Sequence, residues 1–224
     1  MTELNAVIFD YGNVLCDPQT PEDVDAMAGV FGIGRLRFEE FYWRKRVPYD
    51  KSELTPREYW DDFCAMAGLP MLSGEKLQQV MDYDSRSWSH GNAAMIAWAR
   101  HLRASGLKTA VLSNMPLPLR VYLDATYDWL HDFDYRVFSC DVNLVKPQSA
   151  IYELCLTGLG VAPGDALFLD DRPDNITAAR DLGIHGLLFT TPESAHAEID
   201  GRYSIPRLLK SASQEGALGL PAGV

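Results

Sequence analysis

The sequence predicts an α/β protein, with a Rossmann-like parallel sheet covered by helices on both faces and an inserted all-helical cap. Short apolar runs alternate with amphipathic helical patterns along most of the chain. This alternation is typical of parallel strands joined by helices. One long segment, residues 17–91, contains no strand pattern. The 224 residues are enough for a buried core and an insertion.

The strands are predicted from apolar runs that end in polar or turn residues. In chain order they are "NAVIFD" (5–10), "LKTAVLSN" (107–114), the weaker "YRVFS" (135–139), "ALFLDD" (166–171) and "HGLLF" (185–189). Together they predict a sheet of five short, buried strands.

Two helical patterns between the strands are clear. "AAMIAWARHLRASG" (93–106) repeats apolar residues at spacings of three and four and closes at Gly106. "PQSAIYELCLTGLG" (147–160) opens with proline, which favours a first helical turn, and directs Ile151, Leu154 and Leu159 towards a core. These helices are expected to pack against the sheet.

The segment from Asp17 to Gly91 contains only helical patterns, separated by glycine and proline. It is too long for a loop. We therefore expect a core formed by residues 1–16 and 92–210 and a cap formed by residues 17–91. Residues 211–224 have small side chains without periodicity, which predicts a disordered tail.

Composition restricts the partners. The 20 Lys and Arg against 31 Asp and Glu give a formal charge of −11, which disfavours nucleic acid and anionic membranes. Four cysteines show no metal-ligand spacing, and no apolar run is long enough to span a bilayer. We expect a cytoplasmic protein with reduced thiols that binds a small molecule, while monomer and weak homodimer both stay open.

Chemically useful residues lie where the predicted strands end, and Lys146 lies in a loop that opens the predicted helix 147–160. Each could be a helix cap, a turn residue or a surface charge when considered alone. However, the carboxyl ends of parallel strands meet at one edge of a sheet, where ligands bind. The residues at this edge are Asp10, Ser113, Asn114, Lys146, Asp170 and Asp171.

Such a group suits phosphoryl transfer. A carboxylate that attacks a phosphate ester meets a repulsion of about 4 kcal/mol at an effective dielectric of about 20, and a divalent cation and a lysine would offset it. Mg²⁺ prefers oxygen ligands, so Asp10 could bind the ion with one oxygen and attack phosphorus with the other. Lys146 would balance charge, and the Ser113 hydroxyl would bind the transferring group. The product would be an aspartyl phosphate, which water hydrolyses.

The order of "FDYGNVL", "VLSN", "VKP" and "LFLDDRPDNITAARDLG" resembles the haloacid-dehalogenase-like (HAD) hydrolase superfamily over nearly the whole chain. The helical insert is similar to the C1 type of cap in that superfamily. The "FDxGNV" start, "YDKSELTPREYW" and "DDRPDN" resemble the bacterial subgroup containing α-D-glucose-1-phosphate phosphatases, and the N-terminal phosphatase domain of soluble epoxide hydrolases.

This resemblance implies a role for each matching residue. Asp10 would be the nucleophile, Ser113 the phosphate binder, Lys146 the charge balancer and Asp171 a metal ligand. Asp170 would be an alternate metal ligand or a supporting group. Further binding groups would be Gly12 through its carbonyl, Asn13 and Asn114, with Asn175 in support.

Position 12 departs from the superfamily pattern. Most of its phosphatases have a second aspartate two residues after the nucleophile, and this aspartate protonates the leaving group. Gly12 keeps the carbonyl but lacks the acid, whose absence is expected to cost about 10²- to 10⁴-fold in rate with poor leaving groups. Glycine would also allow a positive φ and a close backbone approach to an ion. The sequence therefore favours substrates with good leaving groups, such as an anomeric or acyl phosphate.

Two other functions stay open. A 2-haloacid dehalogenase would use the same aspartate without a metal, but those enzymes usually carry tyrosine at the position of Gly12 and lack the Asp170-Asp171 pair. A catalytically weak phosphometabolite-binding or scaffold protein would also fit the missing acid. Chain order and the cap exclude a phospho-receiver domain.

Substrate specificity is expected to come from the cap. In "FYWRKRVPYDKSELT" (41–55), the aromatic residues and the cations Arg44, Lys45 and Arg46 could grip a sugar or an anion, although cap core and a solvated helix end explain most of them equally simply. His90, beside the hinge, is a candidate replacement acid.

Overall fold

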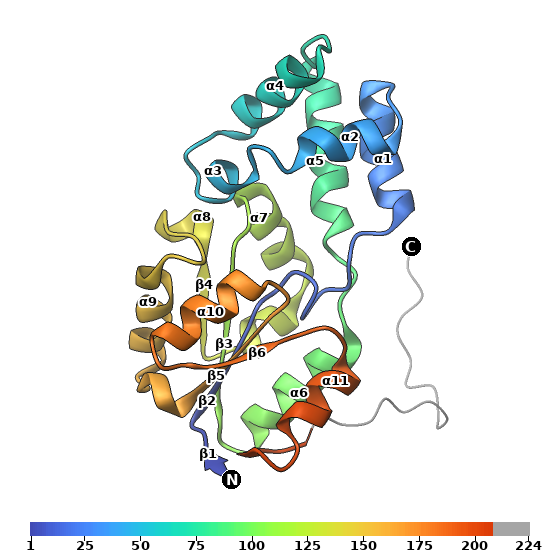
Figure 1. Cartoon of the computed structure of the whole chain (residues 1–224). Coiled ribbons are helices and arrows are strands. Elements are labelled where there is room, and N and C mark those ends of the chain that lie inside the picture. The colour runs from blue at the N-terminus through green and yellow to red at the C-terminus, as the bar shows by residue number, and fades with distance from the viewer. Residues whose placement is uncertain (208–224) are drawn as a thin grey trace, which may run out of the picture.

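The computed structural model describes residues 1–207, which form a parallel five-stranded sheet between two layers of helices, with further helices beyond one edge (Figure 1). In sheet order the strands are β4 (Tyr135–Phe138), β3 (Lys108–Ser113), β2 (Ala6–Phe9), β5 (Ala166–Asp170) and β6 (His185–Leu188). All four neighbouring pairs are parallel. The predicted α/β class and all five predicted strands are confirmed.

Both faces of the sheet are buried, which explains why its strands are apolar throughout. In β2, Val7 and Phe9 point into one hydrophobic core, while Ala6 and Ile8 point into the other. The first core is covered by α6 (Ala93–Ala104), α7 (Leu117–Thr126) and α11 (Pro192–Ile199). The second is covered by α9 (Ser149–Leu159) and α10 (Pro173–Asp181).

Five helices lie between β2 and α6 in the chain, over the edge where the strands end (Figure 1). They are α1 (Pro21–Phe31), α2 (Arg35–Tyr42), α3 (Arg46–Asp50), α4 (Pro56–Ala67) and α5 (Gly74–Ser87). Thr20 and Thr55 form capping boxes that begin α1 and α4. The helices share a hydrophobic core of their own, separate from the two cores of the sheet.

Two connecting segments, near residues 15–17 and 90–92, join these helices to the sheet. They run side by side, because Asp17 N donates to His90 O (2.6 Å) and Asn92 N donates to Leu15 O (2.9 Å). The division into a core (1–16 and 92–210) and a cap (17–91) stays a prediction, which two tryptophan variants test below. The predicted tail, 211–224, lies outside the described residues.

Smaller elements add to or correct the predicted ones. β1 (Thr2–Glu3) and β7 (Tyr203–Ser204) form a short parallel pair, which was not predicted because neither strand is part of an apolar run. Two 3₁₀ turns, η1 (Asp128–Asp132) and η2 (Pro163–Asp165), and the short helix α8 (Ser139–Val142) complete the fold. Pro147 was expected in the first turn of a helix, but it follows a cis peptide bond and precedes α9, which begins at Ser149. In residues 1–207, no helix is both long and apolar enough to cross a bilayer.

Gly158 permits close packing between α9 and β4. A Cβ added there would overlap the Tyr135 ring. Gly158→Ala is therefore expected to lower the free energy of unfolding in urea by about 1–3 kcal/mol, as overpacking does. Gly164→Ala is the matched control, because its added Cβ would have no atom within 4 Å. Equal stability of the two variants would contradict this packing.

Candidate active site

The carboxyl ends of β2, β3 and β5 bring the predicted site residues together around one cavity of about 470 Å³. Asp10 follows β2, Ser113 ends β3, and Asp171 follows β5. The wall at the strand ends consists of Asp10, Tyr11, Gly12, Asn13, Ser113, Asn114, Met115, Lys146, Asp171, Arg172 and Asn175, joined by Leu119. The wall on the side of the inserted helices consists of Trp43, Arg46, Val47, Asp50 and Trp88.

Lys146 links two of the carboxylates. Its Nζ lies 2.8 Å from Asp10 Oδ1 and 2.6 Å from Asp170 Oδ2. The lysine side chain is almost fully buried. Both backbone groups of Lys146 are bonded to the Asn114 side chain, since Lys146 N donates to Oδ1 (2.9 Å) and Nδ2 donates to Lys146 O (3.0 Å). Asn114 thus holds the loop that presents the lysine.

Burial and the neighbouring charges shift the pKa values of Asp10 and Lys146. Burial raises the pKa of Asp10 to about 7, while Lys146 lowers it and the carboxylates of Asp170 and Asp171 raise it. Burial by itself would lower the pKa of Lys146, but Asp10 and Asp170 outweigh burial and raise it. Lys146 is therefore held as a cation between the carboxylates.

Asp170 and Asp171 differ in their surroundings. Asp170 is fully buried and accepts hydrogen bonds from Asn175 Nδ2 at both oxygens (3.0 Å) and from Arg172 N (2.8 Å) in addition to Lys146. Asp171 is half-buried, lines the cavity and accepts a hydrogen bond from Asn13 Nδ2 at Oδ2 (2.8 Å). Of the two neighbouring carboxylates, Asp171 is the one that faces the cavity.

The donor set fits a divalent cation. Asp10, Asp170 and Asp171 each offer an oxygen within 4.8 Å of the others. Lys146 is the one cation that pairs with this cluster in the described residues, so the cluster has two excess negative charges when all four groups are ionised. Hard oxygen ligands with excess negative charge are what Mg²⁺ requires.

The backbone at Gly12 does not adopt the positive φ that glycine would allow, and the positive φ occurs instead at the next residue, Asn13 (φ 58°). A Cβ at position 12 would lie 3.4 Å from the Trp88 ring. Tyr11 Oη donates to Trp88 O (2.7 Å) and so helps to hold Trp88 there. The space beside position 12 is therefore bordered by an indole ring.

The predicted cap cations separate into two groups. Arg44 and Lys45 are exposed and do not line the cavity, and Arg44 pairs with Glu40 (3.0 Å). Arg46 is buried and reaches the cavity. His90 pairs with Asp23 (2.7 Å) away from the cavity lining. The sequence interpretation missed Asp50, Trp88 and Arg172 as lining residues, and no spacing rule marked them.

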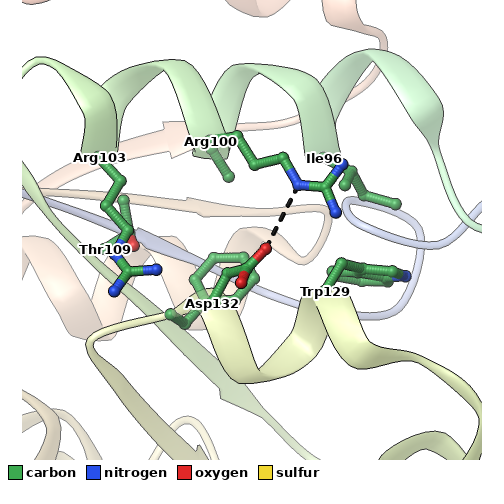
Figure 2. Close-up of a pocket in the computed structure, with 8 residues that line it drawn as sticks. Ile96, Arg100, Arg103, Thr109, Trp129 and Asp132 are labelled. Atoms are coloured by element: carbon green, nitrogen blue, oxygen red, sulfur yellow. Dashed lines mark hydrogen bonds and ion pairs between the residues drawn. The ribbon is translucent and has the colours of Figure 1, made fainter.

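A second hollow lies between α6 and η1 (Figure 2). Its volume is about 10 Å³, which is room for about one water molecule. Arg100 crosses it to pair with Asp132 (3.4 Å). This hollow is too small for a substrate. The cavity at the strand ends is the candidate active site because Asp10, Lys146 and Asp171 line it.

The chain is similar to a protein-family model and to several known proteins. The model of the haloacid dehalogenase-like hydrolases matches residues 4–183. Mouse acyl-CoA dehydrogenase family member 10 is 37% identical over 170 residues, which are 71% of this chain but 15% of that protein. Rat bifunctional epoxide hydrolase 2 is 30% identical over 49% of this chain and 20% of its own length. The chain thus spans a minor part of both relatives.

Other similar proteins match over most of their length. A sesquiterpene phosphatase of Aspergillus oryzae is 24% identical over 84% of this chain and 91% of its own. Among solved structures, an aspartate-to-alanine mutant of a HAD family enzyme from Bacteroides thetaiotaomicron, in complex with magnesium and inorganic phosphate, has a TM-score of 0.66 and 20% identity. The match covers 84% of this chain and 94% of that one, and shows that the two share a fold.

Proposed function

The chain belongs to the haloacid dehalogenase-like hydrolase family, and on this premise we propose that it is a Mg²⁺-dependent phosphatase of a small phosphorylated metabolite, such as a sugar phosphate. The observation that carries the proposal is the placement of Lys146 Nζ between Asp10 and Asp170, beside Asp171, at the bottom of a cavity. A volume of about 470 Å³ suits a small metabolite.

The proposed metal ligands are the Asp10 carboxylate, the Gly12 carbonyl and the Asp171 carboxylate. Bound Mg²⁺ would supply positive charge between the Asp10 carboxylate and the phosphoryl oxygens. Asp170 fits a supporting role better than a ligand role, because both of its oxygens already accept hydrogen bonds. Asn13 orients Asp171 through its hydrogen bond.

In the proposed reaction, an Asp10 oxygen attacks phosphorus and the bond to the leaving oxygen breaks, which leaves an aspartyl phosphate. Lys146 holds the nucleophile and balances the charge of the phosphoryl oxygens. Ser113 and the backbone N–H groups of the neighbouring loops bind the transferring group. Water then hydrolyses the intermediate and regenerates the Asp10 carboxylate.

The comparisons support this choice of reaction. A relative that matches nearly end to end is named a phosphatase, and a protein with the same fold holds magnesium and inorganic phosphate. The pair Asp170-Asp171 also favours metal-dependent hydrolysis of a phosphate ester over metal-independent attack on a haloacid.

The test is phosphate release from sugar phosphates, acyl phosphates and p-nitrophenyl phosphate, each with Mg²⁺ or with chelator. We expect release that needs Mg²⁺ and that Asp10→Asn abolishes. Release no greater than that of Asp10→Asn on every ester would favour the scaffold. Halide release from 2-chloropropionate that survives the chelator would instead favour the dehalogenase.

A further inference from the structure

Asp50 is a carboxyl group that the proposed mechanism has not used. It ends α3, lines the cavity from the side of the inserted helices, and is 8% exposed. Its Oδ1 is buried and makes no hydrogen bond, although it lies 2.9 Å from Arg46 Nε. Asp50 is thus a buried carboxyl group that is paired with Arg46 and borders the cavity, and the proposed reaction gives it no role.

We propose that Asp50 is the proton donor to the leaving group, in place of the acid that Gly12 lacks. This inference rests on the proposed phosphatase function. The cavity lining contains three carboxyl groups within the described residues, those of Asp10, Asp50 and Asp171. Asp10 acts as nucleophile and Asp171 as metal ligand in the proposed reaction, which leaves Asp50 for the proton.

The position of Asp50 suits this step. In a phosphoryl transfer the attacking and leaving oxygens lie on opposite sides of phosphorus. Asp10 attacks from the strand ends, so the leaving oxygen points towards the opposite wall, which consists of Trp43, Arg46, Val47, Asp50 and Trp88. Asp50 is the carboxyl group of that wall. Trp88 meanwhile borders the place where a side chain at position 12 would begin.

Burial, together with the nearby Asp84 carboxylate, keeps the Asp50 proton available near neutral pH by raising the pKa of Asp50. Arg46 is shared with Asp84, which accepts hydrogen bonds from Arg46 Nη1 (3.1 Å) and from Tyr42 Oη. One guanidinium therefore faces two carboxyl groups, and Asp50 is the one with fewer hydrogen bonds. Burial raises the pKa of Asp50 to about 7, with Arg46 lowering it and Asp84 raising it. A group with such a pKa is suited to general acid catalysis.

The other groups that face Asp50 come from three further elements. The charged or titratable ones are Tyr59 on α4, Arg172 after β5 and Cys140 on α8, with Tyr49 next to it in the chain. Arg172 lowers the pKa of Asp50 slightly, and burial raises the pKa values of both tyrosines and of the cysteine. None of these groups competes with Asp50 as an acid near pH 7.

Hydrogen bonds join the backbone around Asp50 to α8 and to the residue that follows it. Ser139 Oγ donates to Asp50 O (2.6 Å), Asn143 Nδ2 donates to Lys51 O (2.9 Å), and Ser52 Oγ donates to Cys140 O (3.0 Å). Figure 1 shows α3 directly beside α8, which carries these partners. These hydrogen bonds place the carboxyl group over the cavity.

The protons balance over both steps. As the Asp10 oxygen bonds to phosphorus and the P–O bond breaks, the Asp50 proton moves to the leaving oxygen, which departs as an alcohol. Asp50 is left as a carboxylate. In the second step, water attacks the aspartyl phosphate and its hydroxyl bonds to phosphorus. The bond between phosphorus and the Asp10 oxygen breaks, Asp10 leaves as a carboxylate, and the proton of the water returns to Asp50.

The test compares Asp50→Asn with the wild type on an alkyl phosphate, whose alkoxide leaving group needs a proton, and on p-nitrophenyl phosphate, whose leaving group does not. We expect kcat/KM to fall by about 10²- to 10⁴-fold on the alkyl phosphate and by less than about tenfold on p-nitrophenyl phosphate. With the wild type, the alkyl phosphate rate should fall above pH about 7, as Asp50 loses its proton. This fall in rate above pH about 7 should be absent in the pH profile of Asp50→Asn. Asp50→Glu, which keeps the carboxyl group, should restore part of the alkyl phosphate rate.

Asp25→Asn is the matched control, since it removes an exposed carboxylate of the inserted helix α1 that lies outside the cavity lining. It should leave the rates on both esters unchanged. Equal losses on the two esters in folded Asp50→Asn, or an unchanged alkyl phosphate rate, would overturn the assignment while leaving the phosphatase proposal intact. A wild type no more active than Asp10→Asn on either ester would overturn both.

Discussion

Replacing Lys146 by methionine is expected to lower kcat/KM for every phosphate ester by about 10³-fold, as loss of a preorganised charge does in an enclosed site. Methionine keeps the apolar stem of the side chain but not the cation that lies 2.8 Å from Asp10 Oδ1. Without that cation, the nucleophile and the phosphoryl oxygens repel each other in a buried site. Phosphate release under saturating Mg²⁺ measures the effect.

The same variant should also lose stability. Lys146→Met leaves the Asp170 carboxylate buried without its ion partner, and breaking a buried pair in this way costs about 3–5 kcal/mol. Removing the second charge, in Lys146→Met with Asp170→Asn, should recover much of the stability without recovering activity. Urea unfolding and the phosphate assay separate the two effects.

Lys76→Met is the control for this prediction. Lys76 is exposed on α5 and lies outside the cavity lining, so its loss should leave both the rate and the unfolding midpoint unchanged. If Lys146→Met kept more than a tenth of the wild-type rate, Lys146 would not balance charge in the reaction.

Replacing Trp60 by alanine is expected to destabilise the inserted helices by about 3–5 kcal/mol, the usual cost of removing a large core side chain. Trp60 is fully buried and packs against Phe31, Tyr59 and Phe63 at ring-centroid distances of 4.8–5.7 Å. Trp98 on α6 is equally buried, in a core of the sheet, with its ring 5.5 Å from that of Phe9. The two tryptophans thus probe separate hydrophobic cores.

Hydrogen exchange of the two variants tests the division into a cap and a core. In Trp60→Ala, amide protection should fall over residues 21–87 and persist in the strands, whereas Trp98→Ala should do the reverse. Loss of protection throughout the chain in both variants would mean that the protein unfolds as one unit. Trp60→Phe should cost less than Trp60→Ala, because a ring remains and the buried Nε1 that lacks a hydrogen-bond partner is removed.

Much of the fold was predictable because buried parallel strands have a strong local signal. All five strands of the main sheet were found within two residues, since each is an uninterrupted apolar run. The pair β1 and β7 was missed, because two residues per strand carry no periodicity. Pro147 was placed inside the helix, whereas α9 begins two residues later at Ser149, because a sequence pattern does not fix the residue at which a helix begins.

The sequence by itself determined the sheet, the helical insertion and the gathering of Asp10, Ser113 and Asp171, because residues that end parallel strands must meet at one edge. Lys146 joins them from the loop before α9. Only the tertiary structure separated Asp170, whose oxygens are occupied by hydrogen bonds, from Asp171, which faces the cavity. Only it brought Asp50 and Trp88 over that edge. Their positions depend on how the inserted helices pack on the sheet, and such packing is set by contacts between residues far apart in the chain, which no local pattern encodes.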